Sequence, residues 1–203
     1  MNFAQIQEML LRCGCCGIER TSAGAQFICP VPKHGSHAFL HSLYKPCDDN
    51  DLAEMHELFG YALPKDYVSF MKLHNGAHFF VGAISIYGWG RVLSRGTSLD
   101  ERAAIFLDSM HREHRLLEGV DWSQSWRPIG GLVAKNRHRL ALNSSAAVRL
   151  RTASGRGRTW QSFTQMLSDC IAAANTCFDC EGIRADGYAN LEEAFEGLAT
   201  PRN

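Results

Sequence analysis

Apolar residues recur at helical spacing in several stretches of this chain. Residues 2–13 carry one such face, and the glycines that follow end it, so the pattern predicts an amphipathic helix. Residues 52–59 form a second short helix, which Asp48–Asp51 can cap and the next glycine can close. A third helix is predicted from Pro64, which suits a first helical turn, to about His74.

Strict alternation of side-chain character predicts strands in the second half of the chain. Arg137–Leu142 and Ala147–Thr152 alternate apolar and basic residues, and the four residues between them favour a hairpin turn. Two shorter apolar runs between residues 78 and 87 are also interpreted as strands. Residues 122–129 are interpreted as a loop, and residues 18–47 as mostly irregular with short β-like pieces.

Capping signals predict further helices. Ser98 and Glu101 have the spacing of a capping box, in which each side chain satisfies a backbone donor of the other residue, and an apolar helical face follows them. Thr159 is expected to cap a closing helix that carries Trp160. A weaker helical pattern covers residues 190–198.

The order of these elements predicts the fold class. Two helices precede strands, then come a helix, a hairpin and a closing helix, and such segregation favours an α+β fold with helices packed on an antiparallel sheet. We expect residues 43–175 to form this single domain. Residues 1–42 are expected to be a helical or irregular extension packed on it, and residues 176–203 a C-terminal tail.

Several short motifs follow one another along the expected domain. They are Asp51–Gly60, Leu63-Pro64-Lys65-Asp66-Tyr67, Asn75-Gly76, Trp126-Arg127-Pro128-Ile129-Gly130 and Trp160–Leu167. Their order and spacing resemble those of the SUKH superfamily, which includes yeast cell-wall-synthesis regulators and many bacterial immunity proteins. The resemblance covers roughly residues 43–174. It departs from the family pattern at Asn143-Ser144-Ser145, where the family often has an acidic residue and a glycine.

The resemblance implies an α+β fold and, in bacterial members, binding and neutralisation of a cognate toxin. It implies no catalytic residue, because the superfamily is not known for a shared catalytic site. Each motif residue also has a structural interpretation of its own. Pro64 begins a helix, Asn75-Gly76 ends it, and the aromatic residues between them pack inward.

Composition and hydropathy narrow the possible environments. An apolar content of 45% suits a buried core and argues against wholesale disorder. The first residues lack the basic and apolar regions of a signal peptide, and the nearly apolar run 79–90 is too short to span a bilayer. We therefore expect a cytoplasmic protein without membrane association.

Cysteine and histidine residues offer a metal site as an alternative. Cys13, Cys15 and Cys16 lie close together, and Cys177-x-x-Cys180 has the spacing of a zinc ligand pair. Further possible ligands are Cys29, His34, His37 and His41. Cys13-Gly-Cys15 is not a standard structural pair, so we favour free thiols in a reducing cytosol and assign no metal and no cofactor.

Sequence motifs of known enzymes give even less support for a function than the possible metal ligands do. His111 and His114 can share a helix face, but their spacing matches neither H-E-x-x-H nor its inversion. The chain also lacks a G-x-S-x-G elbow, a Walker A loop and a G-x-G-x-x-G loop. We therefore predict that the protein is not an enzyme and assign no catalytic residue.

Charge is distributed unevenly although the net charge is zero. Residues 122–168 contain no Asp or Glu and eight basic residues. These are Arg127, Lys135, Arg137, Arg139, Arg149, Arg151, Arg156 and Arg158. Alternation places Arg137 with Arg139, and Arg149 with Arg151, on one face of the predicted hairpin. We call these four residues the basic plate.

Like charges that face each other across a hairpin reduce stability, so something should offset the basic plate. One possibility is that solvent alone offsets the charge, or that acidic residues near the C-terminus do so; these are Glu192, Glu193 and Glu196. The other possibility is an acidic partner. Nucleic acid is not expected, because the pI is near neutral and no nucleic-acid motif is present.

We interpret the chain as a non-enzymatic protein-binding module, with the basic plate as the expected contact surface. An immunity protein that binds a cognate bacterial toxin is the leading hypothesis. A regulatory scaffold for a cellular partner is the alternative, and a zinc-stabilised or zinc-dependent domain is the third. The sequence leaves the partner and the oligomeric state open.

Overall fold

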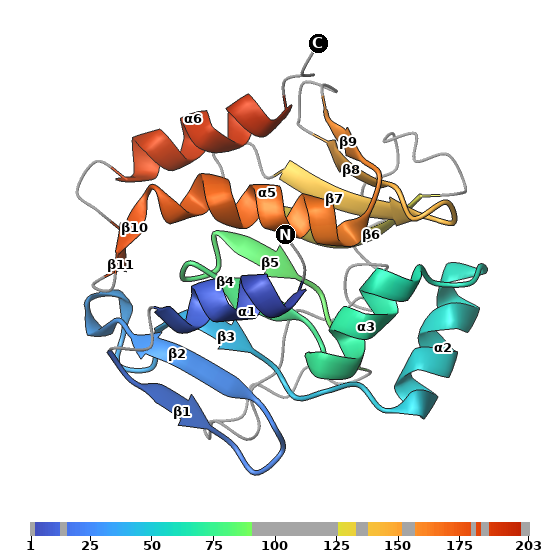
Figure 1. Ribbon diagram of the computed structural model, residues 1–203, viewed down its shortest axis with the longest axis horizontal. Coiled ribbons are helices and arrows are strands. Elements are labelled where there is room, and N and C mark those ends of the chain that lie inside the picture. The colour runs from blue at the N-terminus through green and yellow to red at the C-terminus, as the bar shows by residue number, and fades with distance from the viewer. Residues whose placement is uncertain are drawn as a thin grey trace.

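The described helices gather on one face of the main antiparallel sheet (Figure 1). The computed structural model describes residues 3–12, 16–90, 126–132, 138–151, 157–179, 182–183 and 187–199. The predicted α+β class, with helices packed on an antiparallel sheet, is confirmed. The capping box expected at Ser98 and Glu101, and the helix after it, lie outside these residues.

Nine strands follow their sequence order across the main sheet, and each pairs antiparallel with the next. Their bounds are β1 Ile18–Arg20, β2 Gln26–Pro30, β3 Phe39–Leu43, β4 Ala77–Phe79, β5 Ile84–Ile86, β6 Trp126–Leu132, β7 His138–Asn143, β8 Val148–Arg151 and β9 Thr159–Trp160. A separate small hairpin joins β10 Phe178–Asp179 to β11 Gly182–Ile183. The sheet is thus a meander in which neighbours along the chain are neighbours in space.

The described helices follow the periodicity of the sequence closely. They are α1 Phe3–Arg12, α2 Asp49–Phe59, α3 Lys65–Leu73, α5 Phe163–Asn175 and α6 Gly187–Ala199, with a short 3-10 turn η2 Pro32–His34. Asp48 caps α2 in a reciprocal box with Asp51, and Gly60 closes it in the left-handed conformation. None of the described helices is long and apolar enough to cross a membrane.

Residues 18–47 are not mostly irregular, and that interpretation is wrong. They contain β1, β2 and β3, which belong to the same sheet as the predicted hairpin. The alternation of β2 is hidden because Phe27, Ile28 and Cys29 are all buried, on both faces of the sheet. Cys29 also has a positive φ of 58°, which interrupts the period of two.

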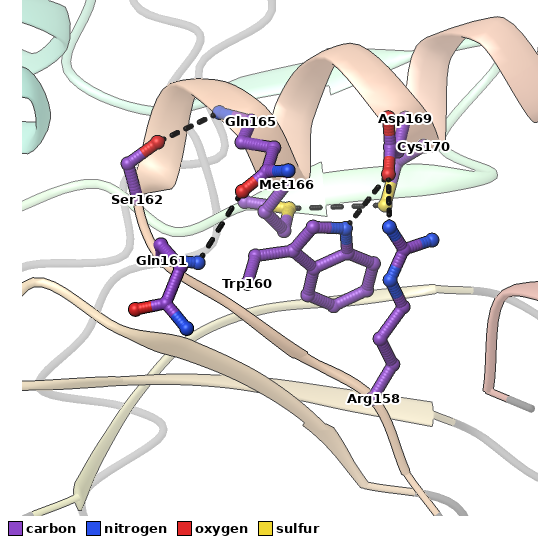
Figure 2. A network of polar contacts seen from close by, with 8 residues as sticks. All are labelled: Arg158, Trp160, Gln161, Ser162, Gln165, Met166, Asp169 and Cys170. Carbon is purple, nitrogen blue, oxygen red and sulfur yellow. Dashed lines mark hydrogen bonds and ion pairs between the residues drawn. The ribbon is translucent and has the colours of Figure 1, made fainter. Parts of the chain in front are cut away.

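Two other local predictions are corrected by the strand pairing. Trp126–Leu132 is the strand β6 and not the end of a loop. Its proline and two glycines are residue types that are common in loops, which explains the interpretation from the sequence. A bulge between Pro128 and Gly130 accommodates them in the sheet. Trp160 lies on β9, and Ser162 rather than Thr159 caps α5 by accepting a hydrogen bond from the Gln165 N–H at 3.1 Å (Figure 2).

The main core lies between the sheet and the helices. The hairpin contributes Leu140, Leu142, Val148 and Leu150, which are fully buried. The helix α5 crosses this face, α6 lies beside α5, and α1 lies over the earlier strands (Figure 1). Phe163 of α5 contacts the rings of Tyr67 and Phe70 on α3, at 5.0 and 5.2 Å. Burial of this apolar surface is the main term that stabilises the fold.

Motif residues shared with the SUKH pattern have clear structural roles. One oxygen of Asp66 accepts from the Tyr67 N–H at 2.9 Å, and the other accepts from the Thr164 N–H at 3.0 Å. Asp66 therefore caps the first turns of both α3 and α5. The side chain of Asn75 bonds both backbone polar groups of Trp89. These motifs hold the fold together, but Asn75 does so by binding Trp89 and not by closing α3, whose C-cap is His74 in an extended conformation.

Buried histidines predict that the protein loses stability in mild acid. Burial lowers the pKa of His41 to about 3 and that of His74 and His78 to about 4. Unfolding returns each pKa to about 6.5, so the unfolded state binds protons that the folded state excludes. Stability is therefore full above pH 6.5 and falls below it. We expect a loss of about 0.7 kcal/mol per histidine between pH 7 and pH 6.

Urea denaturation followed by tryptophan fluorescence at these two pH values measures the effect. The variant His74→Gln removes one of the three imidazoles and should keep about two thirds of the pH dependence. An unfolding free energy that is equal at both pH values would contradict the assignment of these histidines as neutral groups.

Candidate binding surface

The β7–β8 hairpin forms as the alternation predicts, and its register fixes which arginines meet. Arg139 lies directly opposite Arg151, whereas Arg149 lies opposite Ala141. All of these side chains leave the sheet on the face opposite Leu140 and Leu150, away from the described helix that crosses the sheet, residues 163–175. We call Arg139, Arg149 and Arg151 the arginine face. Arg137, the fourth residue of the basic plate, lies outside the described residues.

Arg149 is exposed and lies over an aromatic ring. Its guanidinium carbon is 4.3 Å from the ring centroid of Trp126, the first residue of β6. The pairing of Trp126 with Asn143, and of Pro128 with Ala141, places the indole on the same face of the sheet as Arg149. Trp126 is itself 8% exposed. The cation–π contact attracts the guanidinium to a fixed ring and so restricts where this charge can lie.

Arg139 is held by a phenol. Its Nη1 donates a hydrogen bond to the Tyr87 Oη at 3.0 Å. The hydroxyl reaches this place across Gly131, where an added Cβ would lie 3.3 Å from Tyr87 Oη. Gly131 is opposite Arg139 in the sheet, so the missing side chain leaves room for the tyrosine. The hydrogen bond gives the half-buried guanidinium a polar contact beside Arg151.

One arginine of residues 122–168, the segment without Asp or Glu, belongs to a different site. Arg158 Nη2 is 2.8 Å from Asp169 Oδ2, and the same carboxylate oxygen accepts from Trp160 Nε1 at 3.0 Å (Figure 2). Asp169 is on α5, so this pair lies on the helix side of the sheet. Both side chains are partly shielded, at 15% and 29% exposure. Arg158 is therefore neutralised within the molecule and ties the β9 edge to α5.

The acidic residues near the C-terminus lie away from the arginine face. Glu192, Glu193 and Glu196 are on α6, which packs on α5 on the helix side (Figure 1). Val148 and Trp160 pair on the helix side, whereas Arg149 projects from the opposite face. The sheet thus separates α6 from Arg149. The helix α6 therefore does not cover Arg149.

The cysteines that the structure describes form no disulfide with one another. Burial raises the pKa of the Cys47 thiol to about 12 and also raises that of Cys170, so both stay protonated. Among the described residues, no group of three or more metal-binding side chains comes together. Cys13, Cys15, Cys180, His111 and His114 lie outside these residues.

The strand order, the capped helices and the arginine-bearing hairpin define an α+β protein. Comparison with known families gives a more definite assignment. A model described as the SMI1 / KNR4 family (SUKH-1) matches residues 46–169. This range exceeds half of the chain, so the protein belongs to that family. No curated protein and no solved structure matches it.

The family match confirms the resemblance and its approximate extent. It includes the arginine face but begins after β3, and it ends within α5. The strands β1–β3 therefore lie before the matched range while forming part of the same sheet. Membership is consistent with roles in toxin immunity or in regulation.

Sequence reasoning found three described arginines of the surface but missed the aromatic residues that hold them. Tyr87 is some fifty residues away along the chain from Arg139. The pattern of alternation assigns a face to each strand residue, but it does not say which strands are neighbours. Only the pairing of β5, β6 and β7 brings Tyr87 and Trp126 to the arginines.

Proposed function

We propose that this protein is a non-enzymatic binding module that neutralises a cognate bacterial toxin by covering part of its surface. The arginine face is the observation that supports this proposal most directly. It projects from the sheet on the side opposite α5, and Arg149 is exposed there. A surface of this kind increases the association rate and the specificity for an acidic partner.

Family membership supports the same role, because toxin immunity is what the SUKH resemblance implies for bacterial members. Residues 43–175 would form the binding domain, and residues 1–42 and 176–203 would extend it. The neutral total charge fits a partner with a local acidic patch better than a strongly basic nuclease. A cytoplasmic location would allow the protein to meet a toxin that enters or is made in the same cell.

A regulatory scaffold is the second candidate, since the matching family also takes its name from SMI1 / KNR4 proteins. Genomic context separates the two proposals. A neighbouring gene for a large polymorphic toxin supports immunity, and the absence of such a gene in every genome that carries this protein supports the scaffold.

Charge reversal of the arginine face tests the proposed contact surface. The double variant Arg139→Glu/Arg149→Glu is expected to bind the toxin domain of the neighbouring gene about tenfold more weakly, or worse, because attraction becomes repulsion. Titration calorimetry with the purified toxin domain measures the affinity. Thermal unfolding of each variant checks that the fold is retained.

The matched control is Arg20→Glu/Lys72→Glu, which makes the same change in net charge at two exposed positions away from the arginine face. The control is expected to keep the affinity of the unmodified protein. Equal affinities for both double variants would reject the arginine face as the contact surface. A toxin that remains fully active in the presence of tightly bound protein would reject neutralisation.

A further inference from the structure

We propose that the arginine face recognises carboxylates on an acidic protein segment through guanidinium groups that Tyr87 and Trp126 hold in position. This inference rests on the proposed function and names the chemistry of the partner. It makes Tyr87 and Trp126 positioning residues for the interaction, which neither the family match nor the sequence pattern assigns.

The contact with Trp126 restricts where the Arg149 guanidinium can lie. The guanidinium carbon lies over the Trp126 ring, 4.3 Å from its centroid, while the side chain of Arg149 is exposed to a partner. The donors of a guanidinium lie in the plane of the group. A guanidinium in this state suits a carboxylate, which approaches in the same plane and accepts two parallel hydrogen bonds.

The spacing of the three arginines adds a second element of recognition. Arg139 and Arg151 are direct neighbours on paired strands, which places their Cβ atoms about 5 Å apart. Arg149 and Arg151 are two residues apart on β8, a distance of about 7 Å along the strand. Acidic side chains one turn apart on a helix are separated by about 5 to 6 Å, which is close to these spacings.

Tyr87 fixes the half-buried member of this group. The 3.0 Å hydrogen bond from Arg139 to the phenol oxygen restrains a side chain that otherwise has many rotamers. The phenol ring is 2% exposed, so its own position is set by the sheet. A guanidinium that is already ordered loses less conformational entropy when a carboxylate binds, and the affinity rises accordingly.

The same features favour protein over nucleic acid as the partner. Proteins that bind single strands expose aromatic rings on which bases stack, but Trp126 and Tyr87 are 8% and 2% exposed. Duplex binding commonly uses about six to ten phosphate contacts, whereas the described part of this surface offers three arginines. Three arginines are enough to contact a short cluster of carboxylates, which does not require an extended row of positive charges.

Substitutions that keep the charge test whether guanidinium geometry matters. The probes are a short polyglutamate peptide and a duplex DNA of equal total charge, titrated into the full chain at low ionic strength. Arg149→Lys keeps the charge but removes the planar fork and the stacking, and we expect about fivefold weaker binding of polyglutamate. Tyr87→Phe removes one hydroxyl, and we expect about threefold weaker binding.

Arg20→Lys is the matched control, and it should leave the affinity for polyglutamate unchanged. Heat denaturation confirms that the variants are folded. The inference is overturned if Arg149→Lys and Tyr87→Phe bind polyglutamate as tightly as the unmodified protein, if polyglutamate does not bind, or if the DNA binds more tightly. Should any of these occur while charge reversal still weakens toxin binding, the proposed function stands and only the carboxylate chemistry is wrong.

Discussion

Replacing Gly130 with alanine is expected to lower the free energy of unfolding by about 3 kcal/mol or more. A Cβ at this position would lie 2.4 Å from the Ser85 carbonyl oxygen, well inside van der Waals contact. Gly130 sits in β6 between two paired strands, opposite Ile86 on one side and Leu140 on the other. Neither neighbour can move away without breaking its own ladder of hydrogen bonds.

A loss of this size is a large part of the stability of a typical domain, which is about 5 to 15 kcal/mol. Chemical denaturation gives the free energy of unfolding directly, and circular dichroism shows whether the variant folds at all. The glycine in the WRPIG motif therefore has a structural explanation. It allows the backbones of β5 and β6 to approach each other closely.

Gly197→Ala is the matched control. Gly197 lies within α6, and a Cβ there would meet no atom within 4 Å. Alanine is the better helix former, so this variant should gain about 0.5 to 1 kcal/mol. A Gly130→Ala protein with unchanged stability would show that the strands β5 and β6 are not packed as closely as described.

The second large effect is expected for Asp66→Ala, which should cost about 2 to 3 kcal/mol because one carboxylate caps two helices. Its oxygens accept from the Tyr67 N–H of α3 and from the Thr164 N–H of α5, and the Thr164 hydroxyl lies 3.3 Å from the same carboxylate. Alanine leaves these donors without that partner and also removes a negative charge from two helix N-termini.

Asp49→Ala provides the comparison, since Asp49 is also an acid in a first helical turn. Its ion pair with Lys72 is highly exposed, so its loss should change stability by less than about 0.5 kcal/mol. Urea denaturation of both variants gives the difference. If Asp66→Ala and Asp49→Ala were equally mild, the link between α3 and α5 would depend on apolar packing and not on the shared cap.

These two predictions separate the residues that identify the family from those that carry the proposed function. Gly130 and Asp66 belong to the motifs that resemble the SUKH pattern, and both act on the fold. The arginine face carries the proposed contact and belongs to none of those motifs. Apart from Trp126, which we propose to position Arg149, substitutions in the motifs should therefore reduce the proposed toxin binding only as far as they unfold the protein.

Several features followed from the sequence alone because their causes are local. The cap at Asp48, the left-handed Gly60 and the apolar face of α2 all depend on residues within a few positions of one another. The alternation of arginine with leucine in β7 and β8 likewise predicted both the hairpin and the face from which the arginines project. Such signals can be recognised in the sequence because each of them depends only on residues that are close together along the chain.

Other features were decided only by tertiary structure. Pro128 and the glycines of β6 indicate a loop locally, yet strands on both sides hold that segment in the sheet. The strands β2 and β3 were hard to recognise because burial on both faces removes the alternation that reveals a strand. The partners of the arginines are the clearest case. Trp126 and Tyr87 reach them through strand pairing, and a pairing between distant segments is set by the packing of the whole sheet and not by any one segment's sequence.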